Sequence, residues 1–127
     1  MSSPYFSGTP KSSTAVVSTA NTNRDGTGTL ADLLTAGSSG SLVNGVTFHA
    51  TGTVADGMIR IFHYDGTNNR LIGELKVTAA TPDANVEAWS GEWAPRFPLF
   101  IPATTGKLKA STHNGDTFHA CTSHGDL

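Results

Sequence analysis

Four side chains near the C-terminus have the chemistry of metal ligands and lie close together in the sequence. They are His113, His119, Cys121 and His124. Imidazole nitrogen and thiolate sulfur are ligands that Zn²⁺ prefers in proteins. Whether these groups can share one ion depends on the strands that carry them. The Asn-Gly dipeptide at 114–115 is typical of a two-residue type I′ turn, so we expect a β-hairpin here.

The expected hairpin would separate the candidate ligands. It joins residues 107–112 to residues 116–122. Side chains two apart on a strand point to the same face, so His119 and Cys121 share a face while His113 points to the other. We therefore expect no metal site, a partly buried His119 and a Cys121 in the core.

Sequence motifs of the common catalytic sites are absent. A cupin-type metalloenzyme needs a His-x-His pair with a nearby carboxylate, and no His-x-His occurs. Neither a Gly-x-Ser-x-Gly nucleophile motif nor a glycine-rich phosphate loop before a helix is present. We expect a protein that is not an enzyme and that needs neither metal nor cofactor.

The aromatic side chains offer a different kind of site. Trp89 and Trp93 are four residues apart, so on one strand they would share a face and could stack against a sugar ring. Anchoring of the core or of an interface is the favoured interpretation of both tryptophans. A second apolar concentration lies in a proline-rich stretch at 93–102. The candidate partner-binding residues are Val16, Val17, Trp93, Phe97 and Phe100.

Composition excludes several classes of protein. Only 14% of the residues are charged, three are Glu and none is Gln, which leaves too few polar residues to coat helical bundles or coiled coils. The net charge is −2 and the eight Lys and Arg are scattered singly, so we expect no nucleic-acid partner. Arg60 and Arg70, on neighbouring strands, are expected to be solvated charges. No apolar run approaches the length of a membrane span, and we expect a soluble protein made in a cytoplasm, with no membrane partner.

The pattern along the chain predicts an all-β fold. Short runs of β-branched and aromatic residues alternate with glycine-containing turns every eight to twelve residues, as in a sandwich or barrel. We predict one antiparallel β-sandwich, jelly-roll-like, of eight or nine strands. Residues 46–51, 58–64 and 70–77 should form a three-strand meander, with Gly73 marking a bulge or close packing. Residues 30–34 fit a helical turn or a strand equally well.

The N-terminal region differs in composition from the rest. Residues 1–27 are dominated by Ser, Thr, Asn, Gly and Pro, with one apolar spot at 15–17. Such a segment buries too little apolar area to offset its ordering entropy, so it should be mobile unless a neighbour holds it. We predict an extended N-terminal arm over 1–27 and a β-sandwich domain over 28–127.

Four short stretches resemble a known group of proteins. They are TGT at 51–53, GMIRIF at 57–62, YDGTN at 64–68 and LKASTHN at 108–114. The resemblance is to small β-sandwich structural proteins of the virions of tailed bacteriophages, and it runs from about residue 20 to residue 127. These motifs are turn and strand patterns without a catalytic signature.

The resemblance implies a non-enzymatic role in a virion. Within that group, an acidic sandwich with an N-terminal arm is similar to capsid decoration, or cement, proteins on the outer surface of the shell. The partner would then be the major capsid protein, the arm could tie neighbouring capsomers together, and the chain would assemble as a homo-oligomer, with a trimer as the expected form. The alternatives are a tail, baseplate or fibre-associated module of the same virion, and a carbohydrate-binding module that uses its tryptophans.

Overall fold

The computed structural model describes residues 8–127, and these residues form strands and loops without a helix. Among them, therefore, no helix is long and apolar enough to cross a membrane. The strands are β1 (Thr9–Lys11), β2 (Thr14–Val17), β3 (Ala31–Thr35), β4 (Ser41–Ala50), β5 (Gly57–Tyr64), β6 (Asn69–Val77), β7 (Ser90–Trp93), β8 (Leu99–Ile101), β9 (Lys107–Thr112) and β10 (Phe118–Asp126).

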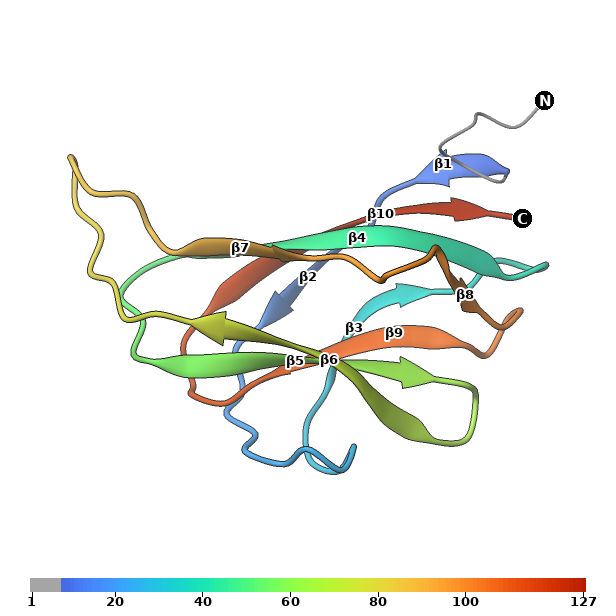
Figure 1. Ribbon diagram of the computed structural model, residues 1–127, viewed down its shortest axis with the longest axis horizontal. Coiled ribbons are helices and arrows are strands. Elements are labelled where there is room, and N and C mark those ends of the chain that lie inside the picture. Colours follow the sequence, from blue (N-terminus) through green and yellow to red (C-terminus); the bar gives the residue numbers. More distant parts are fainter. Residues whose placement is uncertain (1–7) are drawn as a thin grey trace.

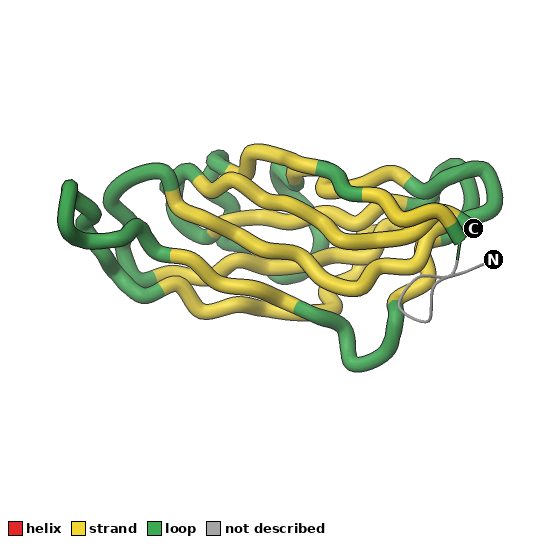
Figure 2. The backbone as a smooth tube through the Cα atoms, turned by 90° about the horizontal axis from the view of Figure 1, so that it is seen from above, coloured by secondary structure: helices red, strands yellow, loops and turns green. Residues whose placement is uncertain are grey.

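The strands form two sheets in which every pairing of named strands is antiparallel. In the six-stranded sheet, β10 and β4 are the central strands; β1 and β2 pair with β10, and β7 and β8 pair with β4. The four-stranded sheet has the order β3-β9-β5-β6. Figure 1 shows the two sheets as two layers, and Figure 2 shows the strands running along the length of the molecule with loops at both ends.

One hydrophobic core lies between the two sheets. Val46 and Phe48 on β4 face Ile59 and Ile61 on β5, and all four are fully or almost fully buried. In β4 and β10 the buried residues alternate with exposed ones, because a strand points successive side chains to opposite faces. The all-β prediction is confirmed, and the two sheets enclose a core as a sandwich requires; the jelly-roll arrangement stays a prediction.

The predicted hairpin and meander are wrong in their pairing. β9 and β10 belong to different sheets, as do β4 and β5, so the connections at 113–117 and 51–56 cross from one sheet to the other. A type I′ turn needs positive φ at both central residues, and neither Asn114 nor Gly115 has it. Instead the Asn114 side-chain amide donates to the carbonyl of Asp56 at 2.9 Å, and the amide of Ala55 donates to the Asp116 carboxylate at 3.0 Å. The two crossing loops are thus tied to each other.

The structure decides one local alternative and confirms one local pairing. Residues 31–35, whose pattern fitted a helical turn or a strand, form a strand, and a register shift between Asp32 and Leu34 lets Leu33 and Leu34 both be buried. The 58–64 and 70–77 pair is the β5–β6 hairpin, with the shift predicted near Gly73. The structure has ten strands in its described part because β1, a three-residue edge strand, had no apolar signal.

The predicted arm lies on its own domain where the structure describes it. β1 and β2 pair with β10, with Val17 opposite Phe118. Val17 is buried in the core, whereas Val16 is 55% exposed on the outer face. The segment was expected to be mobile unless a neighbour holds it, and β10 holds residues 9–11 and 14–17 through strand pairing. The division into an arm over 1–27 and a domain over 28–127 stays a prediction, and residues 1–7 lie outside the described residues.

Candidate interaction surfaces

An apolar surface lies at the edge of the six-stranded sheet formed by β7 and β8. Both strands pair with the same side of β4, and residues 94–98 bridge the gap between them. Pro95 and Pro98 lie in this gap, where the missing N–H groups break no ladder, as their positions in the sequence predicted. The two strands and the bridging loop present the aromatic side chains of this region.

The apolar surface consists of Ile72, Trp93, Phe97, Leu99 and Phe100. These side chains, with the loop between β7 and β8, line a hollow of about 470 Å³. Phe97 is 77% exposed and Phe100 is 49% exposed. Isolated exposed apolar residues are ordinary, whereas a cluster of adjacent ones is a candidate contact surface.

Two glycines leave space for the large aromatic rings of this surface to pack directly against the backbone. A Cβ on Gly73 would collide with the indole Nε1 of Trp93, so β6 passes directly beneath that ring. Gly40 has φ +91° and lies beneath the ring of Phe100. Next to Gly73, Ile72 is the extra residue of the β-bulge in β6, and it points outward beside the tryptophan.

The structure brings three of the five predicted partner-binding residues together. Trp93, Phe97 and Phe100 belong to the apolar surface, whereas Val16 and Val17 lie on β2, at the opposite edge of the sheet. Ile72 is a member that the sequence prediction missed. Gly73 signalled a break in the regular alternation of β6 at this point, but nothing in the local sequence placed Ile72 beside Trp93.

Trp89 and Trp93 do share a face, but it is the inner one. Both are partly buried against the core. Trp89 meets Phe118 edge to face, with ring centroids 5.6 Å apart, and it folds over Gly91. This packing agrees with the interpretation of both tryptophans as anchors, and Trp93 in addition lines the hollow of the apolar surface.

The histidines are spread over different environments. His119 and Cys121 point outward from β10, so the expected partial burial of His119 and core position of Cys121 are wrong. The reason is that Phe118 and Ala120 take the core-facing positions of β10. His124 is buried and bonded to Thr122 at 2.9 Å. Within residues 8–127, no three or more His, Cys, Asp or Glu side chains are grouped so as to hold a metal ion.

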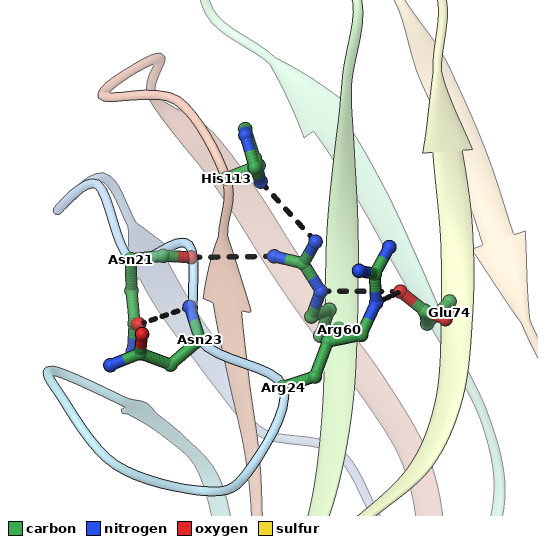
Figure 3. Close-up of polar contacts among 6 residues, drawn as sticks. All are labelled: Asn21, Asn23, Arg24, Arg60, Glu74 and His113. Atoms are coloured by element: carbon green, nitrogen blue, oxygen red, sulfur yellow. Dashed lines mark hydrogen bonds and ion pairs between the residues drawn. The ribbon is translucent and has the colours of Figure 1, made fainter.

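Arg60 is buried beneath the loop that joins β2 to β3, contrary to the solvated charge expected. Its side chain is 1% exposed and lies on the outer face of the four-stranded sheet (Figure 3). Nε donates to Glu74 Oε2 at 3.2 Å, Nη1 to the carbonyl of Asn21 at 3.4 Å, and Nη2 to His113 Nδ1 at 3.2 Å. A guanidinium only donates, so Nδ1 of His113 must be the unprotonated nitrogen.

The loop above Arg60 is itself held by side chains. The amide of Asn21 donates to the carbonyls of Thr27 and Thr29 at 3.0 and 2.9 Å. Arg24 reaches across the sheet and donates to the same Glu74 oxygen at 2.9 Å. These bonds close the loop over the outer face, where Figure 1 shows it on the side away from the other sheet.

Four groups have lowered pKa values, and two of them, Glu74 and His124, are held by contacts between distant parts of the fold. The pKa of Glu74 is lowered, chiefly by the hydrogen bond from Arg24; desolvation opposes this, and the charge of Arg24 and the contacts from Arg60 add to it. The pKa of His124 is lowered by burial, which outweighs the nearby carboxylate of Asp126. Neither group lies on the apolar surface, so both shifts concern the stability of the fold.

Comparison with known proteins gives a likeness of fold. No protein-family model matches the sequence, and no curated protein matches it at a significant level. Among solved structures, a chain of the cyanophage Pam1 capsid asymmetric unit is similar, with a TM-score of 0.50 and 16% sequence identity. The match covers 100% of this chain and 93% of that chain. At this identity the likeness is one of fold, and it extends over the whole chain.

Proposed function

We propose that this protein is a non-enzymatic structural component of a tailed-phage virion, and that it decorates the outer surface of the shell by binding the major capsid protein. The observation that carries the proposal is the likeness of fold to a chain of a cyanophage capsid asymmetric unit, which covers 100% of this chain and 93% of that chain. The turn and strand motifs described above point to the same group of proteins.

The apolar surface is the proposed contact with the shell. Phe97 and Phe100 expose large aromatic area, and aromatic side chains, Phe among them, are enriched at protein interfaces. Arg96 is the one charged residue lining the hollow, which agrees with the depletion of charge at interface centres. Within the predicted arm, β1 and β2 pair with β10. Contact between the apolar surface and the shell therefore does not require these two strands to detach from the sheet.

Assembly as a trimer is part of the proposal and rests on the resemblance. Cement proteins of this kind are often trimers at local threefold positions of the shell. A symmetric oligomer would present three copies of the apolar surface to the lattice, and simultaneous engagement would raise the overall affinity without any new contact.

Copy number in purified virions tests the proposed position. Quantitative mass spectrometry should find this chain in numbers comparable to the major shell protein. A few copies per particle would move it to the tail, baseplate or a unique vertex, and absence from the particle would contradict a virion role.

A matched pair of variants tests the proposed contact. Phe100→Ser should reduce binding to undecorated shells in a sedimentation assay and leave the melting temperature nearly unchanged. Val86→Ser is the control, because Val86 is also 49% exposed but lies in the loop between β6 and β7, away from the apolar surface. Equal binding by both variants would assign the contact to another face.

A further inference from the structure

Two histidines face each other on the outer surface of the six-stranded sheet. His49 on β4 is the register partner of His119 on β10, and both are exposed. Their neighbours along the strands, Phe48 and Phe118 among them, are buried in the core, so the imidazoles point outward. Directly opposite residues of an antiparallel pair have Cβ atoms about 4.5 to 5.5 Å apart.

That spacing suits a shared metal ion. Ring nitrogens bind a divalent transition metal at about 2.0 to 2.1 Å, so two imidazoles on one ion need their nitrogens about 3 Å apart. Side chains that start about 5 Å apart on one face can converge to this separation by rotation about χ1 and χ2. Imidazole suits Zn²⁺, Ni²⁺ and Cu²⁺, whereas Mg²⁺ and Ca²⁺ prefer oxygen ligands.

The surroundings leave room for an ion and its water. His49 and His119 line a hollow of about 620 Å³ that runs along β2 and β10. His49 and Glu92 line a second hollow of about 260 Å³ on the same face. Neither hollow is lined by a Lys or Arg side chain, and the carboxylate of Glu92 favours a cation nearby.

We infer that His49 and His119 form a two-histidine site for an exchangeable divalent transition-metal ion of the Zn²⁺ and Ni²⁺ class. The two ring nitrogens supply two ligands, and water completes the coordination. Cys121 lies on the same face, two residues after His119 on β10 and opposite Thr47, and it is not required as a ligand.

Zinc titration of the untagged, chelator-treated protein tests the site. Isothermal titration calorimetry should show one Zn²⁺ per chain, and Mg²⁺ should show no binding. His49→Ala and His119→Ala should each abolish the Zn²⁺ signal, because a single imidazole cannot chelate. Thr47→Ala, an exposed substitution on the same face that keeps both imidazoles, should bind as the unaltered protein does.

A second readout depends on the folded pairing of the strands. Zn²⁺ should raise the melting temperature of the unaltered protein, because an ion that binds only the native pair stabilises it, and should leave that of His119→Ala unchanged. Retained binding in either histidine variant, equal binding of Mg²⁺, or loss of binding in Cys121→Ser would overturn the two-histidine site.

Discussion

Removal of the Glu74 carboxylate should destabilise the fold through Arg60, which the structure buries almost completely. The guanidinium has one charged partner, Glu74, and two neutral acceptors, the carbonyl of Asn21 and the ring nitrogen of His113. Glu74→Ala takes away the charged partner and leaves a buried cation held by the two neutral acceptors. Loss of one partner of a buried ion pair typically costs about 3 to 5 kcal/mol.

The expected cost here is smaller because Glu74 is partly open to water. Its side chain is 32% exposed, so water can replace some of the lost interaction. We expect Glu74→Ala to cost about 2 to 3 kcal/mol, between the values for buried and exposed pairs. For a domain of this size that corresponds to a fall in melting temperature of roughly 8 to 12 °C. Glu74→Gln keeps one acceptor oxygen and should fall between Glu74→Ala and the unaltered protein.

Arg24→Ala is the matched control. Arg24 bonds to the same carboxylate oxygen, but its own side chain is 59% exposed. Exposed ion pairs contribute about 0 to 1 kcal/mol, so this variant should stay within that range. Urea unfolding measures both free energies under the same conditions. If Glu74→Ala costs no more than Arg24→Ala, the argument from the buried guanidinium is refuted.

The pH dependence follows from the sign of the Glu74 shift. Its folded pKa lies below the ordinary value of 4.5, so the unfolded chain takes up the proton first as the solution is acidified. The contribution of Glu74 is therefore fully present above pH 4.5 and is lost as pH falls through the folded pKa. The stability difference between the unaltered protein and Glu74→Ala should shrink in acid.

Three further predictions concern other parts of the molecule. Gly73→Ala should cost about 1 to 3 kcal/mol in urea unfolding, because its methyl group meets a ring, whereas Gly52→Ala, where nothing lies within 4 Å, should be nearly neutral. His124 has a folded pKa below 6.5, so its contribution is full above pH 6.5 and falls as pH drops below it; His124→Asn should flatten that part of the stability profile. Thr14→Cys should form an intrachain disulfide with its register partner Cys121 on oxidation and keep shell binding, whereas disulfide dimers alone on a non-reducing gel would contradict the pairing of β2 with β10.

Strand positions were predictable because they depend on local pattern. The alternation of Val46, Phe48 and Ala50 with polar residues already marks a strand with one buried face. The prolines at 95 and 98 likewise restricted that stretch to an edge, where β7 and β8 lie. Such signals need no knowledge of the partner strand, since they arise from the period of the backbone and from missing N–H donors.

Strand partners were not predictable in the same way. A strand has the same alternation whether its neighbour in sequence pairs with it or lies in the opposite sheet. The Asn-Gly pair at 114–115 favoured a hairpin locally. In the structure β9 and β10 instead belong to different sheets, which lie on opposite sides of the core. The gain from burying two apolar faces against each other exceeds the small preference of one dipeptide for a turn.

The sequence by itself determined the all-β class, the position of most strands and the apolar character of the β7–β8 edge. Only the tertiary structure decided that Arg60 is buried, that Ile72 joins Trp93, Phe97 and Phe100, and that His49 lies opposite His119. Each of these depends on which distant segment covers or pairs with a residue. Contacts of that kind are set by the packing of the two sheets and the loops over them, and no local pattern records them.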